Sequence, residues 1–164
     1  LVASNPVGAV TTPGDRHLWA APFEVDGEFG GLGPDMATGL GRSLTSRKMA
    51  AMQTQATGQL IPDERGNTTI AIVATDAKLT KAQCQRLAVA AHAGIGRATV
   101  PAHSPGDGDL VFALSTESRQ LQSADADLAQ IGHAASLCLS RAIARSAYCA
   151  HSSPGDLLPC WTAL

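Results

Sequence analysis

A run of β-branched and apolar residues from Thr68 to Thr75 constrains the fold of this chain more than any other feature. Thr, Ile and Val are stiff at the first side-chain torsion and favour extended backbone, so the run predicts a strand that begins at or next to Thr68. Nearly every position after Thr69 is apolar, which is typical of a strand covered on both faces. The preceding residues, Pro62 to Asn67, are polar and contain a glycine. The sequence therefore predicts a buried strand that starts directly after a linker.

Thr68, the hydroxyl residue at the start of this strand, has two interpretations. Held by a rigid strand and approached through a linker, Thr68 could act as a nucleophile. Many strands nevertheless begin with threonine, and Gly66-Asn67 is an ordinary turn pair. The pattern by itself leaves both interpretations open.

A second strand and two helices follow in alternation. Thr80 and Gln83 fit a capping box, which predicts a helix from there to the glycines at 94 and 96. A second apolar strand is expected over Leu110–Thr116 and a long helix over Asp125–Cys149. The expected inner face of that helix is small: Leu128, Ile131, Ala135, Cys138 and Ala142. This order predicts an α/β fold with the two strands side by side and both helices on one face.

The first ten residues read as a strand interrupted at Asn5-Pro6. Proline removes a backbone donor and keeps the preceding residue extended, so the side chain of Asn5 is expected to project out of the strand pairing. The asparagine could equally cap its own turn. Because the chain begins at Leu1 with an apparently buried strand, we expect an upstream portion of the gene product.

A long connector and a tail complete the chain. Residues 25–59 are rich in Gly, Ser, Thr and Gln, which predicts a partly disordered connector with a short helix over Ser46–Gln53. The last residues, Ser152–Leu164, are expected to be loosely held.

Composition narrows the functional classes. The 164 residues suit one domain, and 12 Lys+Arg nearly balance 14 Asp+Glu without a basic stripe, so nucleic acid is not an expected partner. No apolar run approaches the roughly 20 residues of a membrane span, and no signal segment is visible. The four cysteines lack C-x-x-C spacing, so no metal or redox site is expected, the cytoplasm is the default compartment, and a Cys149–Cys160 disulfide stays open.

Two acidic residues in a turn, Asp107 and Asp109, allow several interpretations. They could orient a catalytic amine, or they could be ordinary turn residues. A calcium loop is a third interpretation, but its closing glutamate is missing. His92, near the apolar stripe of the first helix, is expected to be a packed or rim histidine rather than a ligand.

Three segments carry a resemblance to a known family: Asn5-Pro6-Val7-Gly8, Gly66-Asn67-Thr68-Thr69-Ile70 and His103-Ser104-Pro105-Gly106-Asp107-Gly108-Asp109-Leu110 with Val111-Phe112-Ala113. By their order and separation the chain resembles the L-aminopeptidase/D-esterase family, and within it the endo-type 6-aminohexanoate-oligomer (nylon-oligomer) hydrolases. The likeness covers residues 1–10 and 66–148, is thin across the connector and is absent in the tail. It implies part of a four-layer αββα sandwich, the fold of N-terminal-nucleophile hydrolases, shared with ornithine acetyltransferase.

The resemblance assigns roles by position. Thr68 matches the nucleophile and Asn67–Thr68 the bond that the precursor cuts in itself. Asn5 matches an active-site asparagine, our candidate oxyanion donor, and Asp107 and Asp109 match paired acidic residues. The family's lysine would lie upstream of Asn5. Residues 1–67 would then end the larger (α) subunit, and residues 68–164 would form the smaller (β) subunit.

The implied function is a self-processing amidohydrolase or aminopeptidase without a cofactor. It would cleave peptide-like or ω-amino-acid oligomers through an N-terminal threonine, as a homo-oligomer of α/β heterodimers that involves neither nucleic acid nor membrane. Two alternatives stay open: acyl transfer of the ornithine-acetyltransferase kind, and an inactive remnant with a structural or binding role.

Overall fold

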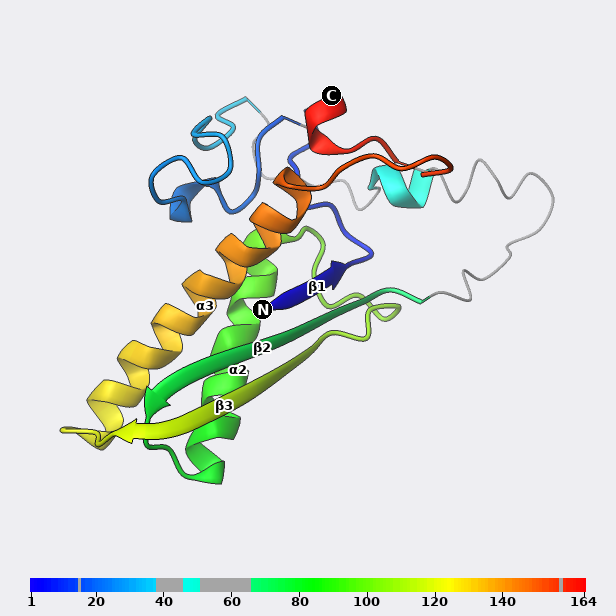
Figure 1. The fold of residues 1–164 in the computed structure, drawn as a ribbon. Helices are drawn as coiled ribbons and strands as arrows, with labels where there is room; N and C mark the ends of the chain where they lie inside the picture. The colour runs from blue at the N-terminus through cyan, green and yellow to red at the C-terminus, as the bar shows by residue number, and fades with distance from the viewer. Residues whose placement is uncertain (15, 38–45, 51–65, 157) are drawn as a thin grey trace.

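The computed structural model describes residues 1–14, 16–37, 46–50, 66–156 and 158–164. Two helices pack against a small sheet (Figure 1). The elements are β1 (Val2–Asn5), η1 (Ala21–Phe23), β2 (Thr68–Ala77), α2 (Lys81–Ala98), β3 (Leu110–Arg119), α3 (Ala124–Tyr148) and η2 (Trp161–Ala163). The predicted α/β class is confirmed. The connector helix expected over 46–53 is seen only at residues 47–50, and its remainder lies outside the described residues.

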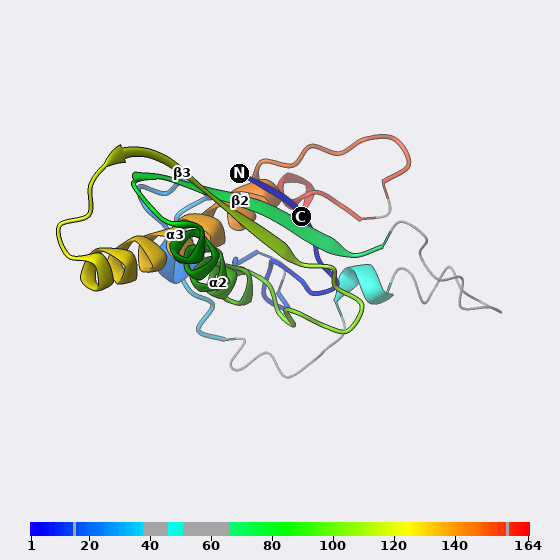
Figure 2. The same cartoon turned by 90° about the horizontal axis from the view of Figure 1, so that it is seen from below.

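Within the described residues the sheet has three strands, in the order β1-β2-β3. The central strand, β2, begins at Thr68 as predicted and pairs antiparallel with β1 and parallel with β3. Parallel neighbours need a crossover, and α2 provides it. The expectation that the two apolar strands are neighbours is thus confirmed. Both helices lie on the same side of the sheet, as predicted (Figure 2).

The helix α2 begins as the capping box predicts. The Thr80 hydroxyl accepts the N–H of Gln83, whose side-chain oxygen accepts the N–H of Thr80. The prediction that glycines end this helix was wrong, because it continues to Ala98. Gly94 instead marks a close approach of α3: a Cβ there would lie 2.4 Å from the carbonyl oxygen of Ser136.

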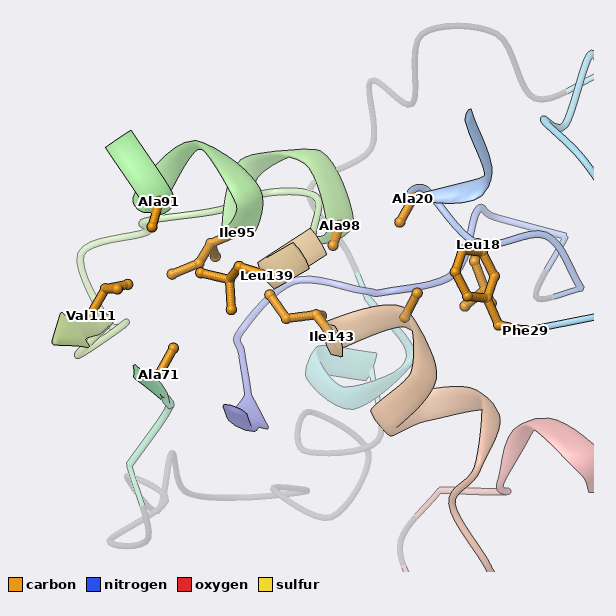
Figure 3. Packing of buried hydrophobic residues seen from close by; sticks show 11 residues of the cluster. Leu18, Ala20, Phe29, Ala71, Ala91, Ile95, Ala98, Val111, Leu139 and Ile143 are labelled. Atoms are coloured by element: carbon orange, nitrogen blue, oxygen red, sulfur yellow. The ribbon is translucent and has the colours of Figure 1, made fainter. Parts of the chain in front are cut away.

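The most deeply buried face of the long helix α3 lies beside the predicted one, of which Leu128, Ile131 and Ala135 are partly buried against the core. Its buried residues are Gly132, Ser136, Leu139, Ser140, Ile143 and Ala144, whereas Cys138 of the expected stripe is exposed. The cause is the contact with α2, since the small residues Gly132 and Ser136 must face that helix to let the backbones approach. Leu139 and Ile143 then reach the core together with Ile95, Ala71 and Val111 (Figure 3).

The prediction that β2 is covered on both faces was wrong for the described chain. Alternate residues such as Ala71 and Val111 are buried under the helices. The opposite face stays open, with side chains about half exposed at Ile70, Ile72, Leu110, Phe112 and Leu114. The apolar run therefore leaves one uncovered apolar sheet face.

Two further segments are held more firmly than the sequence indicates. Phe29, in the expected connector, is buried in the core, and neighbouring Glu28 pairs with Arg141 and Arg145. In the tail, the Trp161 ring packs against Tyr148 at 4.7 Å between centroids. The Cys149–Cys160 disulfide that the sequence left open is not formed, since both cysteines are free. No helix within the described residues is both long and apolar enough to cross a membrane.

Candidate active site

Three segments converge where β2 begins. Asn5, the last residue of β1, is the register partner of Thr68, the first residue of β2. On the other side of β2, Asn67 forms an isolated parallel bridge with Asp107 in the turn before β3. The fold therefore brings together all five residues that the resemblance singles out: Asn5, Asn67, Thr68, Asp107 and Asp109.

The hydroxyl of Thr68 lies beside the carbonyl group of the preceding residue. Its Oγ1 donates to the carbonyl oxygen of Asn67 at 2.7 Å. Thr68 is partly exposed, whereas the neighbouring Thr69 is 0% exposed. The Thr69 hydroxyl points into the interior, where it has no hydrogen-bond partner among the described residues. Of the two threonines, only Thr68 is partly exposed and has a hydroxyl that is hydrogen-bonded to a peptide carbonyl oxygen.

The same carbonyl oxygen has a second donor that sequence reasoning missed. The backbone N–H of Gly108 reaches the oxygen of Asn67 at 2.8 Å. A Cβ on Gly108 would lie 2.7 Å from Oγ1 of Thr68, so this glycine packs directly against the hydroxyl. The only sequence signal was the glycine between two aspartates, which is also common in turns.

The side-chain amide of Asn5 forms hydrogen bonds to two other segments of the chain, at Gly66 and at Lys48. Its Nδ2 donates to the carbonyl oxygen of Gly66 at 3.0 Å, one residue before the carbonyl that Thr68 contacts. Its Oδ1 accepts a hydrogen bond from Nζ of Lys48 at 2.7 Å, and the same ammonium reaches the carbonyl oxygen of Pro6 at 3.2 Å. Sequence reasoning missed Lys48, which lies in the connector without any motif around it.

The carboxylate of Asp107 accepts hydrogen bonds from backbone amides of two different segments. One carboxylate oxygen accepts the N–H of Val7 at 2.8 Å, and the other accepts the N–H of Ser104 at 3.0 Å. Asp107 therefore joins the segment after β1 to its own turn. A carboxylate that accepts N–H groups in this way is a positioning element.

Asp109 holds the start of β2. Its Oδ1 accepts the N–H of Thr69 at 3.0 Å, and its Oδ2 lies 2.9 Å from Nδ1 of His103. The Asp109 side chain is 4% exposed and that of His103 is 45% exposed. Because burial makes an unpaired charge costly, the amide of Thr69 stabilises this carboxylate, whereas its Oδ2 lies beside His103 without a hydrogen bond among the described residues. Within the described residues, no group of three His, Cys, Asp or Glu could hold a metal ion.

Next to this pair lies a second histidine. The rings of His92 and His103 are 5.5 Å apart between centroids. The pKa of His92 is lowered from its ordinary value, chiefly because partial burial disfavours the charged ring and then through the Coulomb interaction with His103; Asp109 opposes these effects. His92 is thus a rim histidine, as predicted.

A cavity of about 280 Å³ opens beside Asn5. Ser46, Lys48, Pro159 and Trp161 are among the residues that line it, and Thr68 is not. The connector and the tail therefore build a hollow next to the asparagine.

Comparison with known proteins places this chain in a family. The model of peptidase family S58 matches residues 25–157. The chain is 33% identical to uncharacterized aminopeptidases of Mycobacterium bovis and Mycobacterium tuberculosis in an alignment of 153 residues; the match covers 87% of this chain and 41% of each relative. An uncharacterized aminopeptidase of Mycobacterium leprae is 43% identical in an alignment of 99 residues, and that match covers 54% of this chain and 27% of the relative. The chain thus spans about two fifths of the length of the first relatives. Together with the convergence of Asn5, Thr68 and the acidic pair, these matches show that the chain belongs to peptidase family S58, the L-aminopeptidase/D-esterase family.

Proposed function

We propose that this chain carries the self-cleavage site and the nucleophile of an N-terminal-nucleophile amide hydrolase. The observation that carries the proposal is the contact between Oγ1 of Thr68 and the carbonyl oxygen of Asn67, at 2.7 Å. This places the hydroxyl beside the group that it would attack. Family membership supports the hydrolase class, since the family is one of peptidases.

Self-cleavage would give Thr68 its catalytic base. In mid-chain the nitrogen of Thr68 is an amide with no basic lone pair. Once the Asn67–Thr68 bond is cut, this nitrogen is a free α-amine with a pKa of about 7.7–8.0, which can accept the hydroxyl proton near neutral pH. The boundary between the two subunits would then lie between residues 67 and 68.

The neighbouring residues would divide the remaining tasks. Asp109 would hold the first peptide of the smaller subunit, as its contact with the N–H of Thr69 suggests. Asp107 would keep the segment after β1 in place through Val7. The amide of Asn5 would serve as an oxyanion donor during substrate turnover, when cleavage has released the Gly66 segment that now occupies it.

The uncovered sheet face supports the four-layer sandwich. Five large apolar side chains stay about half exposed on β2 and β3, more than a stable solvent-facing sheet usually carries. We propose that a second sheet, from the part of the protein beyond this chain, packs on this face and completes an αββα arrangement. This chain spans 41% of the length of these relatives, so most of their length lies outside the match and could supply the second sheet.

The proposed substrates are small amides, either peptides or ω-amino-acid oligomers of the nylon type. The aminopeptidase names of the mycobacterial relatives favour the peptides, and the motif details that resemble the oligomer hydrolases favour the second class. The proposed partners are the chain's own cleaved subunit and further α/β heterodimers. The free cysteines at 84, 138, 149 and 160 suit the cytoplasm.

The decisive experiment uses protein expressed from the complete gene. Its mass spectrum should show two polypeptides, and N-terminal sequencing of the smaller one should read Thr-Thr-Ile-Ala. Purified enzyme should release free amine from peptide amides or from 6-aminohexanoate oligomers. Transfer of the acyl group to added ornithine in place of water would favour the acetyltransferase alternative. An uncut protein with full amidase activity would contradict the proposal.

A further inference from the structure

We infer that the backbone N–H of Gly108 is the oxyanion donor of the self-cleavage step, and that the absence of a side chain there admits the Thr68 hydroxyl. The inference rests on the proposed function, because it concerns the same Asn67–Thr68 bond. It assigns to the peptide backbone a role that sequence reasoning gave to the side chain of Asn5.

The first argument is the position of the donor. Negative charge develops on the carbonyl oxygen of Asn67 when Oγ1 of Thr68 adds to the carbonyl carbon. The N–H of Gly108 lies 2.8 Å from that oxygen, within the range of effective oxyanion donors. The amide of Asn5 is bonded to the carbonyl oxygen of Gly66 and is therefore engaged one peptide earlier.

The second argument is that this donor is held in place before the reaction. Gly108 lies between the two aspartates, and both of their carboxylates are bound to backbone amides. Asp107 is fixed by Val7 and Ser104, and Asp109 by Thr69. A donor fixed in advance needs little reorganisation when charge develops, which is the condition under which oxyanion donors are most effective.

The third argument is the space that glycine leaves. A Cβ on Gly108 would lie 2.7 Å from Oγ1 of Thr68 and 3.6 Å from the carbonyl oxygen of Asn67. The first distance is shorter than any ordinary carbon–oxygen contact. Any other residue would therefore push the hydroxyl away from the carbonyl, although the backbone conformation itself does not require glycine.

The reaction balances with water as the only co-reactant. The Oγ1–C bond to Asn67 forms while the carbonyl electron pair moves onto the oxygen held by Gly108. When this pair returns, the C–N bond breaks, and the hydroxyl proton ends on the nitrogen of Thr68, which leaves as a free amine. Water then adds to the resulting ester, and Oγ1 departs as a hydroxyl. The products are a carboxylate on Asn67 and a free N-terminal threonine.

The test compares two glycines of one turn in protein expressed from the complete gene. Gly108→Ala keeps the N–H but places a methyl group against the hydroxyl. Gly106→Ala is the matched control, because its Cβ would meet only Cγ2 of Val7 at 3.8 Å. In a pulse-chase time course, Gly108→Ala should slow cleavage by at least about 100-fold, the usual effect of a misplaced reacting group, whereas Gly106→Ala should cut at nearly the original rate. Equal cleavage rates of Gly108→Ala and Gly106→Ala would contradict the inference that a side chain at position 108 displaces the Thr68 hydroxyl.

A second variant tests the donor itself and does not depend on whether the alanine variant folds. Replacing the Asp107–Gly108 amide by an ester removes the N–H with almost no change of shape. Cleavage should slow by about 10²–10³-fold, the effect of losing one oxyanion donor. Cleavage of the ester variant at the original rate would overturn the inference. Thr68→Ala in the same assay separates the inference from the proposed function. If Thr68→Ala stays uncut, a normal cleavage rate of the ester variant contradicts only the role of Gly108. If Thr68→Ala is cut, the proposed function itself fails.

Discussion

Asn5 and Thr68 face each other as the last residue of β1 and the first residue of β2. This register places the strand break at Asn5-Pro6 opposite the start of β2. Pairing with β1 does not continue past the break, whereas on the other side of β2 Asn67 still forms a bridge with Asp107. The carbonyls of Gly66 and Asn67 consequently meet different donors, the side chain of Asn5 and the backbone of Gly108. The proposed self-cleavage site thus lies where pairing with β1 stops, and hydrogen-bond donors line it.

The first prediction concerns the two threonines. Thr68→Ala should leave the protein uncut and inactive, because no hydroxyl remains beside the carbonyl of Asn67. Thr68→Ser should still be cut, since serine keeps the hydroxyl and loses only the methyl group that restricts its rotamer. Gel electrophoresis and N-terminal sequencing measure both. Thr69→Ala is the control and should be cut, because the buried Thr69 hydroxyl faces the interior; an uncut Thr69→Ala variant would make Thr69 the agent.

The second prediction concerns Asn5 and Lys48. Asn5→Ala should lower kcat for amide hydrolysis by about 10²–10³-fold, if its amide donates to the substrate oxyanion. Lys48→Met keeps the apolar stem but removes the donor to Oδ1 of Asn5, so its effect should be smaller and in the same direction. Steady-state kinetics on purified, fully cleaved enzyme measures both. Unchanged cleavage and turnover in Asn5→Ala would exclude the oxyanion role.

The third prediction concerns the buried carboxylate of Asp109. Asp109→Ala leaves the N–H of Thr69 without an acceptor, which should cost about 1–3 kcal/mol in the free energy of unfolding. Asp109→Asn keeps an oxygen for that N–H and should cost less. Denaturant unfolding of both variants in a Thr68→Ala background removes any influence of cleavage. Equal stability of the two variants would show that the contact with Thr69 contributes nothing.

The fourth prediction compares two glycines of α2. Gly94→Ala places a methyl group 2.4 Å from the carbonyl oxygen of Ser136 and should destabilise the fold by about 1–3 kcal/mol through overpacking. Gly96→Ala meets open space and should stabilise the helix by roughly 0.5–1 kcal/mol, since alanine is the better helix former. Thermal unfolding distinguishes the two. A stabilising Gly94→Ala would contradict the close approach of α2 and α3.

The fifth prediction concerns pH. The pKa of His92 is lowered in the folded state, so the unfolded chain binds more protons between that pKa and the ordinary value of 6.5. The contribution is favourable above pH 6.5 and is lost as the pH falls through the lowered pKa. His92→Gln should therefore flatten the dependence of stability on pH in this window, as measured by denaturant unfolding at several pH values. The same pH dependence in His92→Gln and in the unchanged protein would contradict the effect of burial on His92.

Local patterns in the sequence determined where the elements lie. The β-branched run from Thr68, the capping box at Thr80 and Gln83, and the second apolar run at Leu110 each specify an element through interactions within a few residues. The resemblance added which side chains to expect at one site. These features predicted the α/β class, the neighbouring strands and the candidate residues around Thr68.

Only the tertiary structure decided how those elements face one another. The close approach at Gly94 makes Gly132 and Ser136, beside the predicted stripe of α3, the most deeply buried positions of that part of the helix. Trp161 and Phe29 anchor segments that the sequence predicts to be loose. The donor on the carbonyl of Asn67 is a backbone N–H, which every residue except proline possesses and no sequence pattern can single out. Its position follows from the register between β2 and the turn before β3. Contacts between residues far apart in the chain depend on such registers, and these are set by packing rather than by local sequence.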